Sequence, residues 1–157
     1  MELPDKKVAV VGIGNILLGD EGVGVHVIES LRKREEMKDV FLVDAGTAFL
    51  EVIYELDGYD KVIIVDAVNG GGKPGDIYRI DPYSLFSESI EKNRSISLHD
   101  YGLIEGLSFG RMAGISIGEV VLIGIEPENI NTYTGLSSTL KERLCDIQKI
   151  IIKEVES

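Results

Sequence analysis

Three things are scarce in this sequence: cysteine, basic residues and long apolar runs. The single cysteine, Cys145, excludes an internal disulfide framework, and we expect it to be a small residue on a helix. Lysine and arginine total 16 against 27 acidic residues, which leaves a net charge of −11. This charge disfavours nucleic acid and anionic membranes as partners, and it favours a basic or cationic partner such as a metal centre.

No apolar run is long enough to span a bilayer, and the first residues, Met-Glu-Leu-Pro-Asp-Lys-Lys, lack a signal-peptide pattern. We therefore expect a cytoplasmic protein that does not act at a membrane. Hydrophobic residues make up 44% of the 157 residues, which is enough for a folded core. With no repeat or low-complexity tract in the sequence, the prediction is one domain over residues 1–157.

Short apolar runs alternate with helical patterns along the chain. Strands are predicted at residues 7–12, 40–44, 61–66, 77–80 and 119–125, with 77–80 at a sheet edge. Helices are predicted at residues 22–34, 49–57, 99–112 and after 137, and residues 82–97 are expected to be irregular. Ser97 with Asp100, and Ser137 or Thr139, are the expected caps of the last two helices. This order predicts an α/β fold, a three-layer α/β/α sandwich around a mainly parallel sheet.

The stretch from Gly12 to Gly24 organises the chain. It holds five glycines and the acid pair Asp20-Glu21, and it joins the first predicted strand to a helix. It does not match a dinucleotide fingerprint, because Leu17 stands where the third glycine belongs, and the chain has no Gly-Lys-Ser/Thr of a P-loop. Nucleotide binding is therefore a minor alternative that a thermal-shift assay would settle.

The segment Gly114-Ile-Ser116-Ile-Gly118 matches the nucleophile elbow of serine hydrolases in its letters. That elbow lies between a strand and the helix that follows it. Here the motif follows a predicted helix and precedes a strand. We therefore expect Ser116 in a turn at the opposite edge of the sheet, where it takes no part in catalysis.

Three residues far apart in the sequence are expected at one edge of the sheet. Glu21 follows the first predicted strand, Asp66 ends the third, and His99 begins the helix before the last strand. The carboxyl ends of parallel strands border the crevice where α/β proteins bind ligands. Two carboxylates and an imidazole form a plausible metal site, and a cation would remove the repulsion between the acids.

Each of these residues also has an ordinary structural explanation, as a helix cap, a strand-end acid or a hydrogen bonder at a helix start. Asp44 reaches the same edge, either as a turn acid or as part of the cleft. His26 is expected to be a surface or half-buried residue of the first helix. The residues alone therefore leave both the structural and the metal-binding interpretations open.

The same residues resemble the signature of the hydrogenase maturation endopeptidases. The segment from Gly12 to Gly24 carries the most specific part, Gly-x-Gly-Asn followed by an acid pair. The agreement continues in order through Asp44-Ala-Gly46-Thr47, Val65-Asp66-Ala67, Pro74-Gly75, Ser97-Leu-His99-Asp-x-Gly102-Leu103, Gly124-Ile-Glu-Pro127-Glu128 and Gly135-Leu136-Ser137. The resemblance covers nearly the whole chain.

The resemblance implies removal of a C-terminal extension from the nickel-loaded precursor of a nickel-iron hydrogenase large subunit. It implies a peptidase that is often classed as aspartic-type, with a twisted, mainly parallel five-stranded sheet and one antiparallel strand. The family's metal ligands fall on Glu21, Asp66 and His99. The nickel that they recognise is implied to come with the substrate rather than to be bound permanently.

Asp44 and Asp66 are the candidate catalytic residues, because either carboxylate would activate a water molecule in such an enzyme. The expected substrate-binding residues, whose main chain a substrate tail would approach, are Gly14, Asn15, Gly22, Gly46 and Thr47. A non-catalytic nickel-binding chaperone and an intrinsic zinc hydrolase are the alternatives. A single processing step needs no oligomer, so we expect a monomer.

Overall fold

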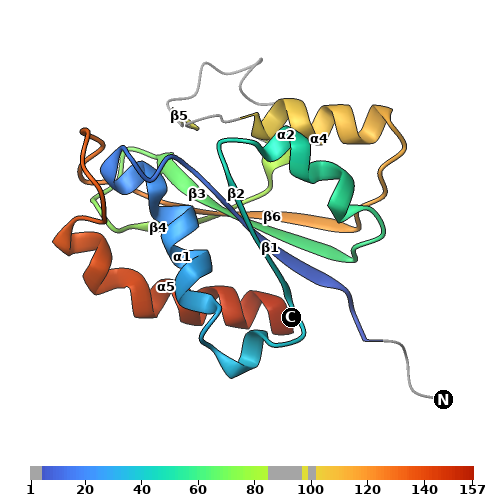
Figure 1. The fold of residues 1–157 in the computed structure, drawn as a ribbon, viewed down its shortest axis with the longest axis horizontal. Coiled ribbons are helices and arrows are strands. Elements are labelled where there is room, and N and C mark those ends of the chain that lie inside the picture. The colour runs from blue at the N-terminus through green and yellow to red at the C-terminus, as the bar shows by residue number, and fades with distance from the viewer. Residues whose placement is uncertain (1–4, 85–96, 99–101) are drawn as a thin grey trace.

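The computed structural model describes residues 5–84, 97–98 and 102–157 of the chain. A central sheet lies between two layers of helices, so the predicted three-layer α/β/α sandwich is confirmed (Figure 1). No helix in the described ranges is long and apolar enough to cross a membrane.

The strands of the sheet lie in the order β2-β1-β3-β6-β4, and the first four are parallel. Their bounds are Phe41–Gly46 for β2, Val8–Ile13 for β1, Lys61–Asn69 for β3 and Glu119–Ile125 for β6. β4 (Ile77–Ile80) is antiparallel to β6 at the edge of the sheet, as predicted. A short strand that the sequence did not predict, β5 (Ser97–Leu98), pairs antiparallel with the end of β3.

Helices cover both faces of the sheet (Figure 1). α1 (Val23–Leu31) and α5 (Ser138–Glu156) pack on one face, and α2 (Phe49–Val52) and α4 (Leu103–Met112) pack on the other. Short 3-10 turns lie at Gly19–Gly22 (η1), Glu35–Met37 (η2) and Ile53–Leu56 (η3). Cys145 is an exposed residue of α5, in agreement with the expectation that it lies on a helix.

β3 is buried on both of its faces. Every residue from 61 to 68 is buried. Ile63 and Val65 belong to the core under α1 and α5, whereas Val62 and Ile64 belong to the core under α2 and α4. Because side chains alternate along a strand, each face receives its own set, and this explains the continuous apolar run in the sequence.

The start of α4 differs from the prediction. The helix begins at Leu103 rather than at residue 99, and Gly102 before it is left-handed, with φ of 81°. Ser97 lies in β5, so the predicted capping box at the start of this helix is wrong. Asp100 lies outside the described residues, as does most of the segment that was expected to be irregular.

Two other predictions at helix ends are confirmed. Ser137 caps α5, and its Oγ accepts a hydrogen bond of 3.4 Å from the N–H of Leu140. Ser116 lies in the turn between α4 and β6, at the edge of the sheet where the parallel strands begin. Its N–H donates to Oδ1 of Asp57 at 2.8 Å, and its carbonyl accepts from the N–H of Gly58 at 2.7 Å. Ser116 therefore has a structural role in this turn.

A buried lysine holds the end of α5 to the sheet. Lys61 is 1% exposed, and its Nζ lies 3.1 Å from Oε1 of Glu154 and 2.8 Å from the carbonyl oxygen of Glu154. Arg79 of β4 binds the same carboxylate, with Nη2 2.6 Å from Oε1. The hydrogen bonds from Arg79, and then from Lys61, hold the pKa of Glu154 below its ordinary value of 4.5.

This ion pair predicts a loss of stability in acid. The folded state holds the proton of Glu154 less readily than the unfolded chain, so the stabilisation is complete above pH 4.5 and is lost as the pH falls through the lowered pKa of the folded state. Urea unfolding from neutral pH to about pH 3 should show a shallower fall in the free energy of unfolding for Glu154→Gln than for the wild type. Parallel pH curves for the two proteins would contradict this role.

Candidate functional site

The glycine loop between β1 and α1 packs tightly against its own neighbours. A side chain on Gly12 would clash with the carbonyl oxygen of Gly24, and one on Gly24 would clash with the carbonyl oxygen of Val65 in β3. A side chain on Gly14, which has φ of 139°, would clash with the carbonyl oxygen of Glu21. These glycines let η1 and α1 approach the ends of β1 and β3, and so they place the acid pair at the sheet edge.

Both members of the acid pair are buried. Asp20 is fully buried, and Glu21 is 5% exposed. The N–H of Glu21 donates to the carbonyl of Leu18 at 3.1 Å, which closes the η1 turn. Because η1 contacts β3, Glu21 lies on an element that touches the strand carrying Asp66.

Asp66 lies within β3 rather than at its end, so that detail of the prediction is wrong. β3 extends beyond its neighbour, because Val65 pairs with Gly12 and β1 ends one residue later, at Ile13. Asp66 is therefore level with the end of β1, where the chain turns towards η1. Its side chain is 1% exposed.

The third predicted ligand, His99, lies outside the described residues. The residue before it, Leu98, pairs in β5 with Val68 of β3. Within the ranges that the structure describes, no three histidine, cysteine or acidic side chains lie close enough to hold a metal ion. A metal bound at Glu21 and Asp66 would therefore have no third histidine, cysteine or acidic ligand from these ranges.

An open groove of about 320 Å³ lies beside the glycine loop. The residues that line it are Asp44, Gly14, Asn15, Gly46 and Thr47, together with the apolar side chains of Ile16, Leu17 and Val25. Asp44 is exposed, and its Oδ1 accepts a hydrogen bond of 2.9 Å from the N–H of Gly46. The groove thus brings the candidate base Asp44 together with four of the five predicted substrate-binding residues.

Gly22, the fifth of those residues, is buried, and a side chain there would meet Cα of Ile16 at 2.7 Å.

A second glycine-rich segment borders the same edge of the sheet. The buried Glu126 follows β6, and its Oε2 accepts a hydrogen bond of 2.8 Å from the N–H of Gly70. The hydroxyl of Tyr78 accepts another from the N–H of Gly72 at 3.1 Å.

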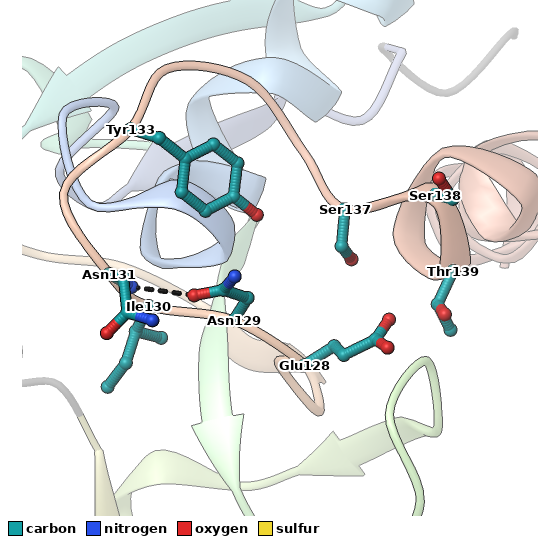
Figure 2. A pocket seen from close by; sticks show the side chains of 8 residues that line it. All are labelled: Glu128, Asn129, Ile130, Asn131, Tyr133, Ser137, Ser138 and Thr139. Carbon is teal, nitrogen blue, oxygen red and sulfur yellow. Dashed lines mark hydrogen bonds between the residues drawn. The ribbon is translucent and has the colours of Figure 1, made fainter.

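A polar cavity of about 580 Å³ was missed by sequence reasoning (Figure 2). Its lining residues are Glu128, Asn129, Ile130, Asn131, Tyr133, Ser137, Ser138 and Thr139. Tyr133 and Asn129 point towards its centre in Figure 2. Burial, and then the charges of Asp20 and Glu128, raise the pKa of the Tyr133 hydroxyl. The sequence signals near this cavity were the matches at Gly124 to Glu128 and at Gly135 to Ser137, and neither predicted a cavity.

His26 is half-buried on α1, as expected. Its Nε2 is buried and has no hydrogen-bond partner among the described residues. Burial lowers the pKa of His26, against the opposing charge of Asp20, and Lys141 lowers it further. This environment favours a neutral imidazole beside the acid pair.

Comparisons of sequence with known proteins point to one family. The profile of HycI, hydrogenase maturation protease, matches residues 25–154. The hydrogenase 2 maturation protease of Escherichia coli is 34% identical over 140 residues, which cover 86% of this chain and 82% of that protein. The hydrogenase expression/formation protein HoxM of Cupriavidus necator is 36% identical over 132 residues. That match covers 82% of this chain but only 63% of HoxM, so the chain spans less than two thirds of this relative.

Comparisons with solved structures point to the same family. The hydrogenase maturating endopeptidase HybD from Escherichia coli has a TM-score of 0.79 at 27% identity, over 96% of this chain and 92% of that one. The hydrogenase 2 maturation peptidase from a Thaumarchaeota archaeon has a TM-score of 0.70 at 31% identity, over 96% and 98% of the two chains. The chain belongs to the hydrogenase maturation protease family.

Proposed function

We propose that this chain is a cytoplasmic endopeptidase that removes a C-terminal extension from the nickel-loaded precursor of a nickel-iron hydrogenase large subunit. Family membership supports the class of reaction, because relatives are named maturation proteases. The observation that carries the proposal is the placement of Glu21 and Asp66. These two nearly fully buried acids lie on contacting elements at one edge of the sheet, and the glycine loop that leads to Glu21 also lines an open groove.

The nickel belongs to the substrate in this proposal. Carboxylate oxygens and imidazole nitrogens bind nickel, and a cation offsets the cost of burying two acids in contacting elements. We propose His99 as the third ligand. The pairing of Leu98 with Val68 supports this, because it brings the chain before His99 to β3 just beyond Asp66.

The groove offers a place for the scissile peptide bond. Asp44 is exposed there whereas Asp66 is buried, so we propose Asp44 as the base and assign Asp66 mainly to the metal. A water oxygen attacks the peptide carbonyl carbon while Asp44 takes the proton of that water. The C–N bond then breaks, and the proton passes to the leaving amine. Activation of water by an aspartate is the feature that this step shares with aspartic-type peptidases.

One cleavage assay tests the proposal. The purified protein is stripped of metal with a chelator and mixed with nickel-loaded or nickel-free precursor large subunit, and the products are identified by mass spectrometry. We expect cleavage of the nickel-loaded precursor alone. Cleavage of the nickel-free precursor would refute metal recognition, and a requirement for added zinc would favour a zinc hydrolase. Binding of the loaded precursor without cleavage would favour a nickel-binding chaperone.

The same assay tests the serine motif. Ser116→Ala should cut the nickel-loaded precursor at the wild-type rate, because Ser116 makes main-chain hydrogen bonds in a turn at the other edge of the sheet. Its hydroxyl therefore has no part in the reaction. Loss of cleavage in a folded Ser116→Ala protein would revive the serine hydrolase interpretation.

A further inference from the structure

Asp20 accepts four hydrogen bonds while it is fully buried. Its Oδ1 accepts from the N–H of Ser137 at 2.8 Å. Its Oδ2 accepts from the N–H of Glu128 at 2.9 Å, the N–H of Asn129 at 3.0 Å and the hydroxyl of Ser137 at 2.8 Å. A carboxylate is a pure acceptor with two oxygens, and this set of donors uses both.

These bonds join two distant parts of the chain, since Glu128 lies 108 residues from Asp20. The main chain adds two more bonds between the same parts. The N–H of Gly19 donates to the carbonyl of Tyr133 at 2.9 Å, and the N–H of Asp20 donates to the carbonyl of Asn129 at 2.8 Å. The η1 turn and the segment 128–137 therefore form one hydrogen-bonded unit.

Glu21 follows Asp20 in the same turn, and its main chain is enclosed. Gly14 lies against its carbonyl oxygen, and Gly22 after it packs against Ile16. Asp20, on the other side of Glu21 in the sequence, fixes the turn by its hydrogen bonds to the segment 128–137. A shift of the η1 turn would therefore have to break the bonds of Asp20 first.

We propose that Asp20 is a positioning residue for Glu21. Its hydrogen bonds hold the main chain of the η1 turn, so that the Glu21 carboxylate is presented at the sheet edge, and they link that carboxylate to the segment 128–137. The part that concerns nickel rests on the proposed function. The carboxylate of Asp20 has no good substitute: asparagine would turn an N–H₂ group towards N–H donors, and glutamate would add a methylene to a filled site.

Amide hydrogen exchange of the metal-free protein tests the hydrogen-bonded unit itself. In Asp20→Asn we expect exchange at the N–H groups of Glu21, Glu128 and Asn129 to accelerate by roughly tenfold or more, because buried hydrogen bonds that close this region are lost. Amides of β3 and β6 should keep their protection. Lys61→Met, which loosens the opposite edge of the sheet, is the control and should leave exchange at Glu21 unchanged.

Cleavage of the nickel-loaded precursor separates positioning from general stability. At a temperature where circular dichroism shows both variants to be fully folded, kcat of Asp20→Asn should fall roughly tenfold or more, whereas kcat of Lys61→Met should match the wild type. A wild-type kcat for Asp20→Asn, or unchanged exchange at Glu21, would overturn the inference.

Failure of the wild type to cleave and failure of Asp20→Asn to fold have different consequences. If the wild type does not cleave the loaded precursor, the proposed function fails, and hydrogen exchange alone then decides whether Asp20 fixes the turn. If Asp20→Asn does not fold, Ser137→Ala replaces it, because it removes one donor to Asp20 and, besides that, only the 3.4 Å cap of α5. A smaller acceleration of exchange and a smaller fall in kcat for Ser137→Ala would support the inference. Wild-type exchange at Glu21 in Ser137→Ala would overturn it.

Discussion

Glu21→Gln should abolish cleavage of the nickel-loaded precursor, with a loss of about 100-fold or more in kcat/KM. Glutamine has the shape of glutamate but lacks its charge, so the buried site retains its packing and loses a strong ligand for a divalent cation. The measurement is the rate of cleavage, with the fold checked by circular dichroism. Because Glu21 is 5% exposed, the substitution acts inside the site rather than at the surface.

Glu29→Gln is the matched control for this prediction. Glu29 is an exposed residue of α1, the helix that follows Glu21, and the chemical change is identical. We expect wild-type cleavage from this control. Full activity in Glu21→Gln would mean that Glu21 is a structural acid, and nickel recognition would then have to lie elsewhere.

Gly24→Ala should lower the free energy of unfolding by about 3 kcal/mol. Alanine is the better helix former by about 1 kcal/mol, which alone would stabilise α1. The added Cβ, however, would clash with the carbonyl oxygens of Val65 and Ile13, which are main-chain atoms of two central strands and cannot move aside. The clash therefore outweighs the gain in helix propensity. Urea unfolding followed by circular dichroism measures the difference.

Glu29→Ala serves as the control for that substitution, because it introduces the same residue at an exposed site of the same helix. Its effect on the free energy of unfolding should lie within about 0.5 kcal/mol. If Gly24→Ala were as stable as Glu29→Ala, the close contact between α1 and the sheet would not be what fixes η1 at the sheet edge.

The central strands were predictable because burial on both faces leaves a continuous apolar run, as in residues 61–68 of β3. The shared edge of Glu21 and Asp66 followed from the same strands. Once β1 and β3 are parallel neighbours, the residues at their carboxyl ends must lie at one edge. The sequence therefore predicted which elements carry the acids, but it did not predict the contacts between those elements.

The role of Asp20 was not predictable in the same way. Its donors are mainly the N–H groups of Glu128, Asn129 and Ser137, and a main-chain N–H is the same in every residue except proline. Only the conformation of the loop brings those groups together, and it leaves no periodic signal. The predicted start of α4 was wrong for a related reason, since Ser97 and Leu98 pair with β3 through a long-range contact, and the helix begins only after Gly102.

Among the residues that the structure describes, four acids are buried where the parallel strands end: Asp20, Glu21, Asp66 and Glu126. Peptide hydrolysis creates a carboxylate that the intact bond lacks. If the chain cuts its substrate in the adjoining groove, as proposed, the new chain end is an anion beside this acidic rim, where nickel would offset the charges of Glu21 and Asp66 but not those of Asp20 and Glu126, and the anion is repelled. The intact precursor is neutral at the same carbonyl group and is not repelled. The rim thus disfavours binding of the cut product, and each turnover leaves the groove free for the next precursor.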